Sequence, residues 1–185
     1  GGLTVVRAVY VIAALFTWAR WLSPEALLPP LERFVDLASI ALLGWAFAPH
    51  GKRGGRIWTL VFGANLAVAV GVLVTFTILW SQTLSGGAAP GYTAHSQATV
   101  WAAWQIGLLL LACFAILRNQ REAWGIPFVA MVIMLLGSIV QVVWPAVVPS
   151  LPVWVRLSNL VASPLITVAV YQYFVTTTYV HVQNV

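Results

Sequence analysis

The chain alternates long apolar runs with short polar breaks, and this pattern predicts its elements. A helix rises about 1.5 Å per residue, so about 20 apolar residues are needed to cross the hydrocarbon core of a bilayer. Gly and Pro cluster in the breaks, where they favour turns. The pattern predicts six membrane-spanning helices, at about residues 3–22, 30–48, 57–81, 97–118, 126–144 and 152–177.

Composition supports a membrane protein. Of the 185 residues, 61% are hydrophobic and only 7% are charged, whereas a soluble domain carries about 25% charged residues. We therefore expect an all-α polytopic bundle that forms one integral-membrane domain over residues 1–185, with the lipid bilayer of the plasma membrane as its main partner. The chain begins Gly-Gly, without Met, so we expect it to be a fragment of a longer protein.

The basic residues predict the orientation of the bundle. Those in the second and fourth breaks and near the amino end fall on one side: Arg7, Lys52, Arg53, Arg56, Arg118 and Arg121. The positive-inside rule makes this side cytoplasmic and places both termini there. The net charge of +5 does not indicate nucleic-acid binding, because the basic residues are few and are distributed among the breaks between apolar runs and the helix ends. Trp residues near the predicted helix ends are typical of an interfacial aromatic belt.

Polar and aromatic groups gather at the predicted outer ends of the helices. Glu32 and Asp36 are four residues apart and share one face of the second predicted helix. Arg156 and Asn159 share a face of the sixth in the same way. The full candidate set is Glu32, Asp36, Trp101, Trp104, Gln105, Gln141, Arg156 and Asn159.

Two interpretations of this set remain open. In the first, the acids pair with Arg156, Arg33 or Arg20 in salt bridges that fix helix register, and a helix amino end by itself favours acidic residues. In the second, the set lines an outward-facing cup that holds a small polar ligand. Ionisable groups inside a membrane are costly and commonly functional, although these lie near the interface.

Small residues and one proline predict how the helices pack. Gly63, Ala67 and Gly71 form a stripe on the third predicted helix where another helix can approach closely. We expect Gly44, Gly107 and Gly137 to serve the same purpose. Pro164 lies inside the sixth predicted helix and should kink it, which makes it a candidate hinge.

The sequence lacks the residues that several kinds of cofactor site and catalytic site require. The only lysine, Lys52, falls in a loop, which excludes a retinal Schiff base within the predicted helices. His50, His95 and His181 do not share a helix face at metal or haem spacing. No catalytic or phosphate-binding motif is recognisable. We therefore expect no enzymatic activity, no cofactor and no metal site in this chain.

Three stretches, "PPLERFVDLASIALLGWAF", "WAAWQIGLLLLA" and "VRLSNLVASPLITVAVYQ", resemble the amino-terminal membrane regions of bacterial sensor histidine kinases and of related signalling proteins with GAF or PAS domains. Such proteins are common in filamentous green bacteria (Chloroflexota). The resemblance covers most of the chain. It implies a sensory input module, part of a two-component system, whose last helix leads into cytoplasmic domains, and it implies a homodimer.

Three functions follow from these observations. The first is a membrane-embedded sensory domain in which the outer polar set detects a ligand or a membrane state. The second is a small transporter or channel, although no charge lies near the middle of a predicted span. The third is a structural subunit of a larger membrane complex, which would copurify with a fixed partner.

Overall fold

The computed structural model describes residues 8, 11–12, 24–48, 54–86, 92, 96–119, 124–144 and 152–183. These residues form an all-helical fold of five helices. The helices are α2 (Pro24–Phe47), α3 (Gly54–Ser85), α4 (Ser96–Asn119), α5 (Gly125–Val143) and α6 (Val153–Gln183). The helical class predicted from the hydrophobic pattern is therefore confirmed.

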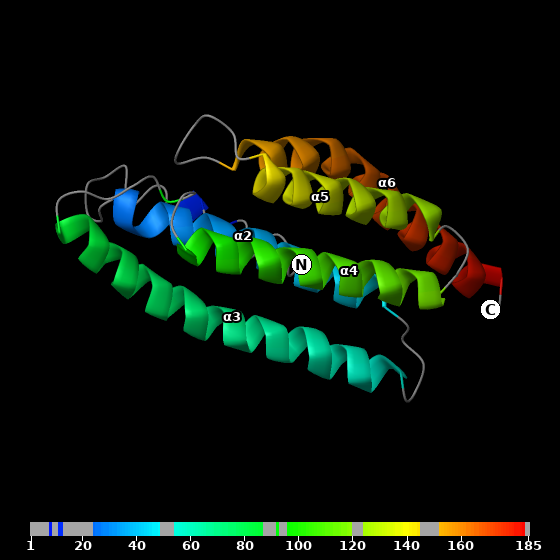
Figure 1. The fold of residues 1–185 in the computed structure, drawn as a ribbon. Helices are drawn as coiled ribbons and strands as arrows, with labels where there is room; N and C mark the ends of the chain where they lie inside the picture. Colours follow the sequence, from blue (N-terminus) through cyan, green and yellow to red (C-terminus); the bar gives the residue numbers. More distant parts are fainter. Residues whose placement is uncertain are drawn as a thin grey trace.

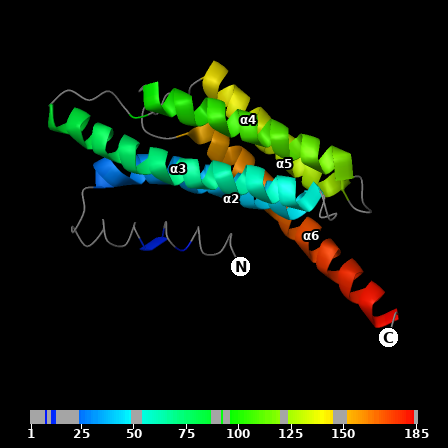
Figure 2. The same cartoon turned by 90° about the horizontal axis from the view of Figure 1, so that it is seen from below.

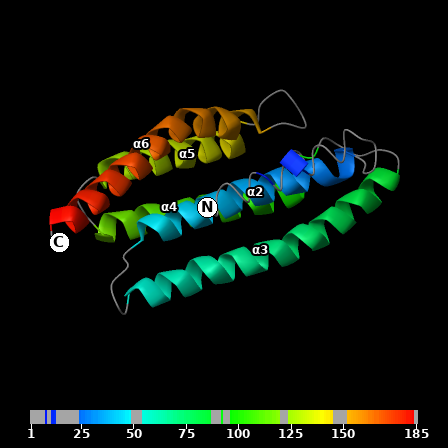
Figure 3. The ribbon, with the colours of Figure 1, turned by 180° about the vertical axis from the view of Figure 1, so that it is seen from behind.

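Consecutive helices run antiparallel to each other and form three layers (Figure 1). Helices α2 and α4 lie side by side in the middle, α3 covers one face and the α5–α6 pair covers the other, as the view from behind also shows (Figure 3). We call the end where α2 begins the Glu32 end and the opposite end the Arg118 end. Because successive helices alternate in direction, the starts of α2, α4 and α6 all lie at the Glu32 end.

Four helices in the described parts of the chain are long and apolar enough to cross a membrane: α3, α4, α5 and α6. Helix α2 overlaps the second predicted span but carries four charged residues, Glu25, Glu32, Arg33 and Asp36, which sets it apart from the other four helices. The first predicted span, 3–22, lies outside the described residues except for Ala8, Val11 and Ile12. Six spans and cytoplasmic termini therefore stay predictions.

The outward surface is strongly apolar, as expected for a protein in lipid. Large aliphatic side chains are exposed on α3 and α6, with Leu60 at 63% and Leu160 at 72% of their full exposure. A soluble monomer rarely presents contiguous apolar surface on this scale. The interior, by contrast, is built from α2 and α4, where Leu37, Ile40 and Leu109 are completely buried.

Two glycines lie where neighbouring helices pack closely. A side chain at Gly44 would meet the ring of Phe62 on α3 and Ala112 on α4, and one at Gly137 would meet Ser158 and Trp154 on α6. Both positions confirm the predicted role of glycine in close packing. A β-carbon added at Gly63 or Gly71 on α3, or at Gly107 on α4, would meet nothing within 4 Å. The two glycines of the stripe predicted on α3 therefore face none of the described residues.

Helix α6 is continuous through Pro164. A proline lacks the amide N–H that an α-helix would use at that position, yet the helix continues from Val153 to Gln183. Figure 2 shows its carboxyl-terminal part projecting beyond the ends of the other helices. The hinge role of Pro164 stays a prediction.

Candidate functional site

Glu32 and Arg156 form a two-pronged ion pair between α2 and α6. The Arg156 Nε donates to Glu32 Oε1 at 2.7 Å, and Nη2 donates to Oε2 at 2.9 Å. The Arg156 side chain is 45% exposed and that of Glu32 is 17% exposed. Parallel bonds of this kind fix the mutual orientation of the two groups as well as their distance.

One turn further along both helices, a second contact joins the same pair of helices. The Asn159 Nδ2 donates to Asp36 Oδ1 at 3.3 Å, and the Asp36 side chain is buried. We call Glu32, Asp36, Arg156 and Asn159 the α2–α6 bridge. The sequence placed each pair on one helix face, and the structure brings the two faces together.

The remaining predicted site residues are used in other helix contacts. Gln105 on α4 donates to Ser138 Oγ on α5 at 3.1 Å. Gln141 on α5 accepts from the backbone N–H of Trp154 at 3.1 Å, at the start of α6. These amides therefore tie neighbouring helices together at separate places and do not join the α2–α6 bridge.

The two tryptophans of α4 stack on each other, with ring centroids 5.8 Å apart and planes 9° from parallel. The indole N–H of Trp104 donates to Asn65 Oδ1 on α3 at 3.0 Å. Trp101 is buried and meets Phe76 of α3 edge-on, at 5.7 Å between centroids. Its indole N–H has no hydrogen-bond partner among the described residues.

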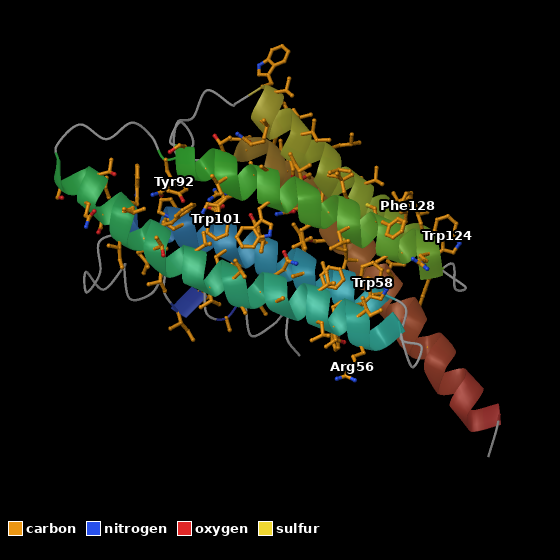
Figure 4. The ribbon with its side chains drawn as sticks, turned by 60° about the horizontal axis from the view of Figure 1, so that its bottom comes forward. Arg56, Trp58, Tyr92, Trp101, Trp124 and Phe128 are labelled. Carbon is orange, nitrogen blue, oxygen red and sulfur yellow. The ribbon has the colours of Figure 1, made fainter. Side chains whose placement is uncertain are left out.

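Tyr92, which the sequence analysis did not select, lies at the same end of the bundle. Its ring packs edge-on against Trp80 of α3, with centroids 4.9 Å apart. Its hydroxyl is buried near the indole N–H of Trp101, but neither atom meets hydrogen-bond geometry with a described group. Figure 4 shows Tyr92 and Trp101 together at the Glu32 end, far from Arg56, Trp58 and Trp124.

Arg33, on α2, is a third residue that interacts with Tyr92. Its side chain is buried, and its charge interacts with Asp36 and Glu32 on its own helix and with Tyr92 beyond it. We call Arg33, Tyr92 and Trp101 the Tyr92 cluster. A lone aromatic ring in the Gly-, Ser- and Ala-rich break between the third and fourth predicted spans was the signal that could have pointed to Tyr92.

Burial raises the pKa of Tyr92 to about 12, while Trp101 and the positive charge of Arg33 oppose the shift. The folded state therefore favours the neutral phenol, and the pKa in the unfolded chain is about 10. This contribution to stability is complete below pH 10 and is lost as the pH rises from 10 to 12. We expect a Tyr92→Phe variant to lose less thermal stability than the wild type between pH 9.5 and 11.5 in detergent.

The prediction fails if the two proteins lose stability in parallel over that range. Tyr171→Phe is the matched control, because it removes the hydroxyl of a tyrosine that is exposed on α6.

No group of three His, Cys, Asp or Glu side chains that could hold a metal ion occurs within the described ranges. Cys113 is buried in α4 with a free thiol. Comparison with family models, curated proteins and solved structures finds no match to this chain. The function must therefore be argued from the α2–α6 bridge.

Proposed function

We propose that this chain is a membrane-embedded sensory input domain in which α6 carries the signal. The observation that carries the proposal is the α2–α6 bridge. Helix α6 packs extensively on α5, whereas α2 packs on α3 and α4. Two polar contacts join α2 to α6: Arg156 with Glu32, and Asn159 with Asp36.

Polar contacts of this kind suit a switch. Apolar helix packing changes little with conditions, but an ion pair near a membrane interface responds to a ligand or to local electrostatics. A stimulus that favours one arrangement of α2 and α6 over another would shift the population between them. Because α6 projects beyond the other helices, a small shift at Arg156 would be carried along its length.

In this proposal the bundle crosses the plasma membrane six times, with the Glu32 end outside and both termini in the cytoplasm. Arg56 and Arg118, at the opposite end, agree with the positive-inside rule. The resemblance to the membrane regions of sensor histidine kinases supports a cytoplasmic output domain after α6 and a homodimeric assembly.

The decisive experiment starts from the gene. The reading frame beyond Val185 should continue into a dimerisation helix and a kinase or cyclase domain. In that full chain, Arg156→Gln should change the output activity severalfold, whereas the matched control Arg56→Gln, at the far end of the bundle, should not. A stop codon directly after Val185, or equal output from both variants, would overturn the proposal.

A further inference from the structure

Helices α5 and α6 fit closely together in the half of the bundle towards the Glu32 end. A β-carbon at Gly137 on α5 would overlap the side chain of Ser158 and lie 2.9 Å from the backbone oxygen of Trp154 on α6. The side chain of Gln141 on α5 also accepts from the backbone N–H of Trp154, at 3.1 Å. A slide of α6 along α5 would break this bond and press another turn of α6 against Gly137. These contacts therefore hold the two helices as one unit, the α5–α6 pair.

The boundary between α5 and α4 is built from more adaptable groups. Gln105 Nε2 on α4 donates to Ser138 Oγ at 3.1 Å, so the face of α5 that carries Ser138 is turned towards α4. Met134 and Met131 lie one and two turns before Ser138 on this face; they are the only two methionines of the chain, and both are buried. Methionine is unbranched and flexible, so it keeps its packing when a neighbouring helix shifts by a small distance.

The boundary between α6 and α2 is polar. Arg156 is the single Asp, Glu, Lys or Arg residue of α5 and α6, and it donates to both carboxylate oxygens of Glu32. Asn159 donates to Asp36 one turn further along. A two-pronged contact between a guanidinium and a carboxylate has one preferred geometry. The α2–α6 bridge therefore fixes where the α5–α6 pair lies against α2.

We propose that the α5–α6 pair moves as one rigid unit against α2, α3 and α4, and that the α2–α6 bridge holds it in the described arrangement. The bond between Gln105 and Ser138 holds the same arrangement from α4. Small sliding motions of packed helices are a common form of conformational change. The inference names the moving part of the proposed sensory function, and its role in signalling rests on that function.

The test measures distances between spin labels on the full chain in lipid nanodiscs, by pulsed electron paramagnetic resonance. Cys113, the one cysteine of the chain, is first replaced by Ala. Cysteines for labelling are then introduced in pairs at Val74 on α3, Leu136 on α5 and Leu160 on α6, whose side chains are 56%, 55% and 72% exposed. The three pairs report the α3–α5, α3–α6 and α5–α6 distances.

In an Arg156→Gln variant we expect the α3–α5 and α3–α6 distances to shift together by about 1–2 Å, the size of helix shifts in such transitions. The α5–α6 distance should not change. Gln105→Met keeps the length of the side chain but removes the amide that bonds Ser138, and it should shift the same two distances. Arg56→Gln is the matched control, because it removes one charge at the opposite end of the bundle, and all three distances should stay as in the parent chain.

A joint shift in either variant, with the α5–α6 distance constant, supports the proposal. A change in the α5–α6 distance would mean that α6 moves on its own, and this result overturns the proposal. Unchanged distances in both variants, or an equal shift in Arg56→Gln, overturn it as well.

These distances are measured without any output domain, so the test separates the two proposals. Joint shifts in a chain whose output ignores Arg156→Gln would keep the moving pair and remove its role in signalling. An output that responds to Arg156→Gln without a joint shift would keep the sensory function and remove the moving pair.

Discussion

Replacing Gly137 by Ala should lower the free energy of unfolding by about 2 kcal/mol, the middle of the range for overpacked sites. A β-carbon at this position would overlap the side chain of Ser158 and lie 2.9 Å from the backbone oxygen of Trp154. A backbone oxygen in the first turns of α6 cannot move without shifting the helix. Helices α5 and α6 would have to separate, which would also loosen the bond between Gln141 and the Trp154 N–H.

Gly107→Ala provides the matched control for this measurement. Both glycines lie inside a helix, but a side chain at Gly107 meets nothing within 4 Å. Unfolding in a denaturing detergent, followed by circular dichroism, should leave Gly107→Ala close to the wild type. Equal stability of the two variants would show that α5 and α6 are not in close contact at Gly137.

Breaking the ion pair between Glu32 and Arg156 should have an effect of similar size. Arg156→Ala leaves the carboxylate of Glu32, which is mostly buried at 17% exposure, without its bidentate partner. Exposed pairs contribute roughly 0.2–1 kcal/mol, and removing one partner of a fully buried pair costs about 3–5 kcal/mol. For this partly buried pair we expect a loss of about 2 kcal/mol.

A double-mutant cycle isolates the interaction. Glu32→Gln combined with Arg156→Gln should be less destabilising than the sum of the two single changes, with a coupling of about 1–2 kcal/mol. The same unfolding assay provides all four free energies. Strictly additive losses would mean that the two side chains do not interact in the membrane, and would remove the main support for the α2–α6 bridge.

The positions of the helices follow from the sequence because they depend on local properties. Apolar length, Gly and Pro predicted α3 as 57–81, and the structure has it at Gly54–Ser85; α5 was predicted as 126–144 and extends over Gly125–Val143. The close-packing glycines were predicted in part. Gly44 and Gly137 do contact neighbouring helices, whereas Gly107 does not, because the periodicity of one helix does not show which of its faces meets another.

The contacts of the candidate site residues were predicted only in part. The pairing of Glu32 with Arg156 was among those expected, because each helix presents its polar residues on one face. The hydrogen-bond partners of Gln105 and Gln141 were not predictable, since each side-chain amide bonds to whichever helix lies next to it. Tyr92 was missed because a loop has no periodicity from which its position in space can be derived.

By itself, the sequence determined an all-helical, strongly apolar chain with its polar residues near particular helix ends. These properties depend on residue type and spacing over a few turns. Only the tertiary structure decided that α6 meets α2 through Arg156 and Glu32, and that Tyr92 and Trp101 lie together beside Arg33. Those contacts join residues far apart along the chain, and they exist only once the order and rotation of the packed helices are fixed.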